Sequence, residues 1–322
     1  MRAAYTEELG PPEVIRYGEL PVPQPGPTDV VVEVMATAVN HVDTFVRSGA
    51  WRTPLAFPFV VGRDLVGTVA EAGPGAPGFR PGDRVWCNSM GHDGRQGAAA
   101  ERVVVPADRL YRLPDGVDPV EAVALAHPAA TAYLALFTHG RLRAGETVLV
   151  AGAAGNVGSA LVVMAAQAGA RVVATARADD AEYCRSLGAA EVIDYRDPEA
   201  VYPDGVDVYV DTSARNDLPA AVELLAKRGR IVVMAGLRTR PVLPVGALYL
   251  KDCSVSGFAI SQATTSELAE AAAAVNRLMA TGLLRPRTVE VLPVSEAAEA
   301  HRRVEAGDVR GKLVLRVGAQ RP

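Results

Sequence analysis

The stretch TVLVAGAAGNVGSAL, residues 147–161, reads as an apolar strand, a glycine-rich turn and the start of a helix. Its glycines, Gly152, Gly155 and Gly158, have the spacing G-x-x-G-x-x-G. In such a βαβ unit the first glycine permits the tight turn, the second lets the backbone approach a pyrophosphate, and the third allows close helix–strand packing. The N–H groups and positive dipole end of the following helix then stabilise phosphates. The stretch therefore predicts a dinucleotide site; a tight turn without a ligand is the alternative.

Strands and helices alternate around this turn. Apolar runs that alternate with helices are typical of a parallel sheet covered on both faces. The predicted fold class is therefore α/β, with a doubly wound parallel sheet. The strands expected are 147–151, 171–175, 191–193, 207–211, 230–235 and 253–258, and the helices expected are 156–168, 179–187 and 217–227.

The first 120 residues follow a different pattern. Short β-rich runs, such as DVVVEVMATAV (29–39) and LVGTVAEAG (65–73), are separated by proline and glycine, which predicts an antiparallel β domain. A helix is expected at 118–142, where an Asp precedes a Pro at the first helical position. After a helix at 265–284 we expect another strand and helix and then a final strand, GKLVLRV (311–317), which should rejoin the first domain.

Composition and charge limit the possible functions. A chain of 322 residues suits two domains, and its net charge of −4 predicts no nucleic-acid partner. The cysteines, Cys87, Cys184 and Cys253, lack C-x-x-C spacing, which excludes a four-cysteine zinc site and a disulfide framework. No signal region is evident and no run approaches 18 uninterrupted apolar residues, so we expect a cytoplasmic protein with no membrane partner.

The end of the second strand of the βαβ unit bears on the choice of cofactor. An acidic residue there, about 20 residues past the glycines, accepts the ribose hydroxyls of NAD. This chain has Ala176 at that point, followed by Arg177, whose guanidinium suits a 2′-phosphate. The sequence thus favours NADPH, and Tyr195, after the next strand, is a candidate contact at the adenosine end. The alternative is that Arg177 is a solvated arginine beside Asp179 and Asp180, and that Tyr195 is an ordinary half-buried tyrosine.

Motifs spread over nearly the whole chain resemble the medium-chain dehydrogenase/reductase superfamily, and within it the zinc-independent quinone oxidoreductase (zeta-crystallin-like) branch. The motifs are N-x-x-D (Asn40 to Asp43), R-S-G (47–49), G-x-D-x-x-G-x-V (Gly62 to Val69), PGDRV (81–85), TAY (131–133), AGAAGNVGSA (151–160), RGRIV (228–232) and GKLVL (311–315). The resemblance implies a GroES-like β domain from residues 1–122 and 263–322, with a Rossmann domain at 123–262 between them. It also implies homodimers that form through the edge strand near 253–258.

Zinc-dependent members of the superfamily differ from this chain at their ligand positions. They place a cysteine where this chain has Asn40 and His-Glu where it has Arg63 and Asp64. Catalytic zinc needs about three protein ligands. An arginine is not a ligand and Asn40 is a poor one, which leaves only Asp64 and His127. We therefore expect an enzyme without a metal. For His127 itself, a packed side chain bonded to backbone is favoured over a role in the cleft.

Without a Lewis acid, hydride transfer suits an acceptor that is already electrophilic, such as a quinone or a conjugated carbonyl. The candidate catalytic residues are Asn40, Asp43 and Arg63. Asn40 is a candidate amide donor to the cofactor or substrate, and Arg63 a charge that offsets developing negative charge. The alternative is that Asp43 and Arg63 form a buried ion pair that ties two β segments together.

The remaining candidates concern the cofactor. Ser213, Gly236 and Phe258 end strands of the parallel sheet, where ligands of such sheets bind, and the resemblance places Thr131 near the nicotinamide. With the turn and the second strand, the full set is Thr131, Gly152, Ala154, Gly155, Asn156, Val157, Gly158, Ala176, Arg177, Tyr195, Ser213, Gly236 and Phe258.

Two other functions stay open. One is an enoyl-thioester reductase of a biosynthetic pathway, and the other is a non-catalytic NADPH-binding sensor or structural protein. The segment VDTSARND (210–217) also departs from the Val-Gly that usually follows this Asp in the quinone oxidoreductase pattern, which points to an altered nicotinamide-side loop. The expected partner is a small electrophilic acceptor.

Overall fold

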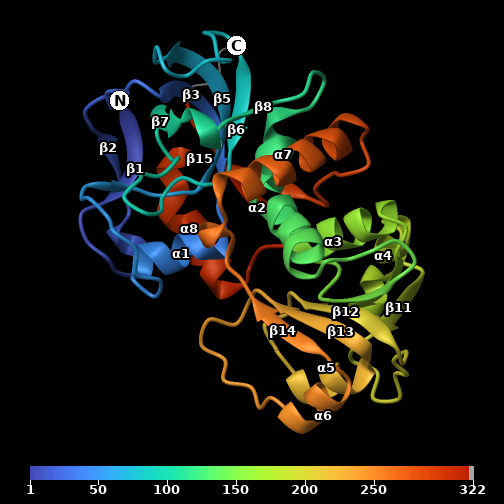
Figure 1. Cartoon of the computed structure of the whole chain (residues 1–322). Helices are drawn as coiled ribbons and strands as arrows, with labels where there is room; N and C mark the ends of the chain where they lie inside the picture. Colours follow the sequence, from blue (N-terminus) through green and yellow to red (C-terminus); the bar gives the residue numbers. More distant parts are fainter. Residues whose placement is uncertain (319–322) are drawn as a thin grey trace. The chain divides into compact units, whose positions relative to one another are not determined.

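The computed structural model of the chain describes residues 1–318 (Figure 1). Two units can be distinguished. The first contains Met1–His127 together with the segment from Leu268 onward, and the second contains Pro128–Glu267. The first unit is thus built from both ends of the sequence, and the second from its middle.

The first unit holds two sheets. A seven-stranded sheet has the order β15-β16-β3-β5-β6-β8, with β7 also paired to β3, and a three-stranded sheet has the order β2-β1-β4. Its strands are β1 (Arg2–Thr6), β2 (Arg16–Glu19), β3 (Asp29–Ala38), β4 (Phe59–Val60), β5 (Asp64–Ala72), β6 (Arg84–Cys87), β7 (Arg102–Pro106), β8 (Tyr111–Arg112), β15 (Val289–Pro293) and β16 (Lys312–Arg316). Within residues 1–318 the strand pairs of this unit are antiparallel, except that β15 and β16 are parallel.

The last strand lies in the first unit, as expected. Val314 of β16 pairs with Ala38 of β3, so the carboxyl-terminal segment extends the sheet begun by the amino-terminal one. Helix α1 (His41–Ser48) follows β3 directly and contacts α8 (Ala297–Ala306), which precedes β16. These connections place residues near 40, 64 and 312 in one part of the unit.

The second unit is a six-stranded parallel sheet with the order β11-β10-β9-β12-β13-β14. It confirms the predicted α/β class. Helix α3 contacts β9 and β10, and α5 contacts β13. The elements are β9 (Thr147–Ala151), α3 (Asn156–Gln167), β10 (Arg171–Ala176), α4 (Ala181–Ser186), β11 (Glu191–Asp194), β12 (Val206–Asp211), α5 (Leu218–Leu224), β13 (Leu225–Val233), α6 (Val245–Leu250) and β14 (Ser254–Gly257).

The boundaries of three elements differ from the predictions. Strand β13 begins at Leu225, directly after α5, rather than at 230, because its first residue pairs with Val206 before a register shift. The helix expected at 118–142 is α2 (Pro119–Tyr133), continued by a π-helical segment, Leu134–His139. Helix α7 (Thr265–Ala280) is likewise shorter than predicted.

The segment Pro119–His139 is the one stretch of residues 1–318 that is long and apolar enough to span a membrane. Its most apolar window is 72% buried inside the protein, which is typical of the core helix of a folded domain.

Candidate functional site

The glycine-rich turn joins β9 to α3, and each glycine has its own reason to be there. Gly152 has a φ of 80°, which a residue with a side chain rarely adopts. A Cβ on Gly158 would lie 2.2 Å from the carbonyl oxygen of Gly152, so α3 packs against the turn only because this side chain is absent. Gly155 is exposed, and a Cβ there would meet only the Gly152 oxygen, at 3.4 Å. The turn therefore leaves open backbone at Gly155.

Helix α3 begins at this open backbone. Gly155 is its N-cap, and the Ser159 N–H donates to the Gly155 carbonyl at 2.8 Å. The N–H groups before Ser159 lie in the first turn, which contains no acidic side chain. Ala154, Asn156 and Val157 are half-buried beside it. The turn thus fits a diphosphate group in both space and charge.

Three arginines surround Tyr195 next to the carboxyl end of β10. Arg177 follows that strand, and its hydrogen bond to the Tyr195 hydroxyl lowers the pKa of that tyrosine. The Arg215 guanidinium lies 5.0 Å from the Tyr195 ring centroid, and that of Arg196 lies 5.9 Å away. Ala176, where an NAD-specific acid is expected, is buried at the end of β10. Sequence reasoning found Arg177 and Tyr195 but missed Arg196 and Arg215, because they follow two other strands.

The loop after β12 is held by one buried carboxylate. Asp211 accepts hydrogen bonds from the Ser213 N–H at 2.6 Å, the Ser213 hydroxyl at 2.7 Å and the Asn216 N–H at 2.7 Å. Asn216 then donates through Nδ2 to the Ala235 carbonyl at 3.0 Å and to the Thr239 hydroxyl at 2.9 Å. Hydrogen bonds to Asp211 therefore fix the altered segment 210–217, and Asn216 connects it to the loop that follows β13.

Gly236 has a structural requirement of its own in that second loop. Its φ is 88°, and a Cβ would lie 2.5 Å from Asn216 Nδ2. Phe258, which follows β14, stacks on His139 with ring centroids 4.3 Å apart, and Thr131 on α2 is buried. All of the predicted cofactor residues lie in the second unit.

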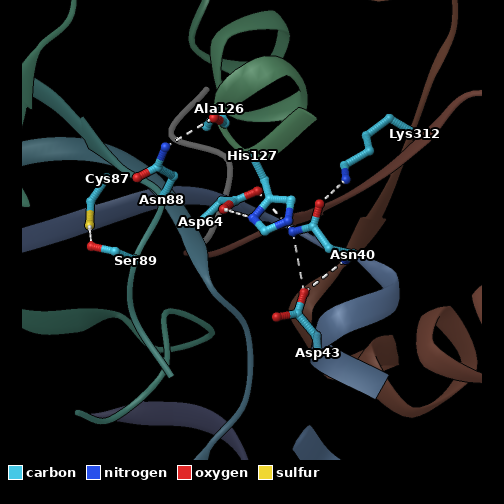
Figure 2. Close-up of polar contacts among 9 residues, drawn as sticks. All are labelled: Asn40, Asp43, Asp64, Cys87, Asn88, Ser89, Ala126, His127 and Lys312. Atoms are coloured by element: carbon cyan, nitrogen blue, oxygen red, sulfur yellow. Dashed lines mark hydrogen bonds and ion pairs between the residues drawn. The ribbon is translucent and has the colours of Figure 1, made fainter. Parts of the chain in front are cut away.

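A cluster of buried polar side chains occupies the first unit (Figure 2). Asn40 lies at its centre: its Oδ1 accepts a hydrogen bond from the Lys312 ammonium, and its Nδ2 donates to Asp64 Oδ2 at 2.9 Å. Asp43 accepts from the Asn40 backbone N–H at 2.8 Å, which caps the start of α1. His127 Nδ1 lies 3.8 Å from Asp64 Oδ1. We call these five residues the Asn40 cluster.

Burial controls the protonation of the Asn40 cluster. It raises the pKa of Asp64 to about 7, although the Lys312 ammonium acts in the opposite direction. It raises the pKa of Asp43 and lowers the pKa of Lys312. Burial also lowers the pKa of His127 well below its usual value, so this imidazole is neutral at pH 7.

The structure brings the three predicted catalytic residues of the first unit together, but in a different arrangement. Within residues 1–318, no hydrogen bond or ion pair joins the side chains of Asp43 and Arg63; Asp43 bonds to Asn40 instead. The two buried groups are therefore not in direct contact, although the charge of each shifts the pKa of the other. Arg63 is 2% exposed, and its Nη2 has no hydrogen-bond partner. The amide of Asn40, predicted to donate to a ligand, donates to Asp64.

Sequence reasoning missed Lys312 as a member of the cluster. The available signal was a lysine at the start of an apolar strand, in a chain whose only lysines are Lys227, Lys251 and Lys312. Among residues 1–318, no group of three or more His, Cys, Asp or Glu side chains is arranged to hold a metal ion.

Comparisons with known proteins agree with the fold of both units. Residues 26–115 match the alcohol dehydrogenase GroES-like domain family, and residues 187–315 match the zinc-binding dehydrogenase family. The chain is 31% identical to Homo sapiens quinone oxidoreductase over 98% of its own length and 97% of that protein.

Two solved structures are also similar. An NAD-dependent alcohol dehydrogenase aligns with a TM-score of 0.86 and 34% identity, covering 99% of this chain and 100% of that one. Escherichia coli quinone oxidoreductase complexed with NADPH aligns with a TM-score of 0.83 and 25% identity, covering 98% of this chain and 100% of that one.

Proposed function

The chain belongs to the medium-chain dehydrogenase/reductase superfamily, in its quinone oxidoreductase branch, and from this we propose that it is a zinc-independent, NADPH-dependent reductase of quinones or other conjugated carbonyls. The family supports an oxidoreductase that uses a nicotinamide cofactor. The preference for NADPH, the absence of zinc and the class of acceptor are the parts that we propose.

The group of Arg177, Arg196 and Arg215 around Tyr195 carries the NADPH proposal. A 2′-phosphate adds about two negative charges, for which guanidinium groups are suited donors. Strand β10 ends at Ala176, which is buried and apolar. The end of this strand therefore offers no carboxylate that could accept hydrogen bonds from ribose hydroxyls. The E. coli relative is described as a complex with NADPH, which agrees with this preference.

The chemistry of the Asn40 cluster supports a reaction without zinc. Both ends of the Asn40 amide are bonded, to Lys312 and to Asp64, and the Lys312 ammonium repels a second cation. Arg63, the residue before Asp64, is not a metal ligand. Among the described residues, no three His, Cys, Asp or Glu side chains are arranged to bind a catalytic metal ion.

When bound, the reduced nicotinamide supplies the hydride. The chain's own residues have holding roles: the turn at Gly155 and the start of α3 bind the diphosphate, and Arg177 with its neighbours binds the adenosine phosphate. Asp211 and Asn216 fix the loops at the carboxyl edge of the sheet, where ligands of such sheets bind.

The test follows the oxidation of NADPH and NADH against a benzoquinone, a naphthoquinone, a 2-alkenal, an enone and a crotonyl thioester. We expect NADPH-dependent turnover of a quinone, an enone or the alkenal. Turnover of the thioester alone would favour the enoyl-thioester reductase. Oxidation of a simple alcohol with NAD, dependent on zinc, or tight NADPH binding with no turnover, would refute the proposal.

Arg177→Ala tests the cofactor preference separately. Losing charge-assisted hydrogen bonds to a phosphate should lower kcat/KM for NADPH by about tenfold and leave the value for NADH nearly unchanged. Arg171→Ala is the matched control, because Arg171 is an exposed arginine at the opposite end of the same strand, paired with Glu191. Equal losses with both cofactors would contradict the assignment.

We also propose that the chain forms homodimers through β14. This strand is the edge of the parallel sheet, and its outer side has no partner among residues 1–318. Exposed apolar side chains lie on α6 and the loop before it, which immediately precede β14: Val242, Val245, Tyr249 and Leu250 are 62–75% exposed. An unpaired edge strand beside an exposed apolar surface is suited to pairing with a second copy.

A further inference from the structure

Lys312 is the least expected member of the Asn40 cluster. It is 4% exposed at the first position of β16, and lysine is among the residues least often buried. A buried ammonium is costly unless it is paired. Its hydrogen bond goes to a neutral amide, the Oδ1 of Asn40, which lies 272 positions earlier in the sequence.

The ammonium determines which way the Asn40 amide faces. An ammonium only donates hydrogen bonds and an ionised carboxylate only accepts them, so an amide between the two has one permitted orientation. Oδ1 faces Lys312, and Nδ2 faces Asp64 at 2.9 Å and Asp43 at 3.4 Å (Figure 2). Without the ammonium, Oδ1 would lose its donor, and the amide would be held only by the bonds of Nδ2 to the two carboxyls.

The Asp64 carboxyl is bonded unequally as a result. Its side chain is fully buried; Oδ2 accepts from Asn40, whereas Oδ1 has no hydrogen-bond donor. His127 Nδ1, at 3.8 Å from Oδ1, is beyond hydrogen-bonding distance. Oδ1 is therefore the atom of this carboxyl that can carry a proton without breaking a contact.

We propose that Lys312 is a positioning residue, which acts through the Asn40 amide to hold the Asp64 carboxyl with one oxygen bonded and the other open to a proton. That this carboxyl serves the reductase rests on the proposed function; the linkage between Lys312, Asn40 and Asp64 does not. Neither Lys312 nor Asp64 was among the catalytic candidates from the sequence.

The charges around Asp64 make the linkage measurable. The titratable and charged groups that face it are Asp43 from α1, Arg63 from the segment before β5, Cys87 from β6, His127 from α2 and Lys312 from β16, and His41 from α1 interacts with Lys312. Burial lowers the pKa of His41 and His127 and raises that of Cys87, so near pH 7 these three are neutral. Two carboxyls thus face two cations, and removal of Lys312 leaves Arg63 alone to balance both.

The experiment is a 13C NMR titration of aspartate carboxyls in the intact protein, without cofactor or acceptor. Asp64→Asn assigns the Asp64 resonance by its loss. In Lys312→Met, which keeps most of the length of the side chain but not its charge, we expect the Asp64 midpoint to rise by about one pH unit or more. Lys312→Arg keeps the charge, so the Asp64 midpoint in this variant should stay close to the wild-type value.

A second variant tests the amide itself. Asn40→Ser retains a residue suited to the start of α1 but is too short to join Lys312 and Asp64, and it should also raise the Asp64 midpoint. It keeps the proposal testable if Lys312→Met does not fold. An unchanged midpoint in either folded variant, or no recovery with arginine, would overturn the proposal.

Turnover separates this proposal from the proposed function. If both hold, the pH profile of NADPH-dependent reduction moves in Lys312→Met in the same direction as the carboxyl titration. Shifted titrations in a protein that reduces no acceptor would refute the reductase and retain the linkage. Quinone reduction together with an unshifted Asp64 titration would refute the linkage and retain the reductase.

Discussion

Gly155 and Gly158 lie three residues apart in the same turn, yet a methyl group should affect them in opposite ways. In Gly158→Ala the new Cβ would lie 2.2 Å from the Gly152 oxygen and 2.8 Å from Ala153 Cα, so backbone must move. Overpacking of this kind costs about 1–3 kcal/mol, and the better helix propensity of alanine returns up to about 1 kcal/mol. We expect a net loss of about 1–2 kcal/mol in the free energy of unfolding.

At Gly155 the same change meets open space. The φ is −76°, which alanine adopts freely, and the nearest atom to the new Cβ is the Gly152 oxygen at 3.4 Å. Stability should stay within about 0.5 kcal/mol of the wild type, since the entropy gained by replacing glycine offsets the poorer N-cap. The methyl group would instead occupy the space at which a phosphate approaches, so the Kd for NADPH should rise about tenfold or more.

Urea unfolding without cofactor and a fluorescence titration with NADPH measure the two effects. Each variant is the control for the other. A Gly158→Ala protein as stable as the wild type would refute the packing argument, and a Gly155→Ala protein that binds NADPH normally would refute the placement of the diphosphate.

Three further predictions concern other parts of the chain. The pKa of Asp64 is raised in the folded state from 3.8 to about 7, so the stability that its protonated form contributes is full at acid pH and is lost as pH rises from about 4 to 7. In Asp64→Asn this pH dependence of the free energy of unfolding, worth on the order of 4 kcal/mol, should be absent from urea unfolding measured across that range. The same pH dependence in both proteins would contradict the prediction. Asn216→Gly, which keeps the positive φ but loses both Nδ2 bonds, should cost about 1–2 kcal/mol in thermal unfolding and weaken NADPH binding, whereas an unchanged Tm would show that the two loops are not coupled. Tyr249→Glu should convert a dimer into a monomer in sedimentation equilibrium, and a wild-type monomer would refute the interface.

The predictable parts of the fold are those set by local signals, namely the spacing of apolar residues and the glycines and prolines between elements. The strand, turn and helix of residues 147–161 and the alternation after them needed no long-range information, and the parallel sheet confirmed them. The boundary of β13 was wrong because its first residue is placed by pairing with Val206, which no local pattern around Leu225 reveals. Helix and strand compete over such short apolar segments, and the neighbouring strand decides between them.

The candidate sites show the same limit more strongly. Arg177 was found because it follows a strand at a known position in the motif, but Arg196 and Arg215 belong to two other crossovers and converge only in space. Asn40 and Asp43 were found together because they are three residues apart. Their partner Lys312 comes from the far end of the sequence, and its ammonium turns a predicted donor to the ligand into an internal contact.

The position of Lys312 in the sequence has a consequence for biosynthesis. The second unit, Pro128–Glu267, is contiguous and is complete while the segment from Leu268 onward is still being synthesised. The amino-terminal strands emerge earlier but lack β16, and with it the cation that faces two carboxyls destined for burial. During translation those carboxyls remain hydrated, since burying them without a counter-charge is unfavourable. The unit that contains residues 1–127 therefore closes only after β16 has been added, and until then its apolar strands lack one of their partners.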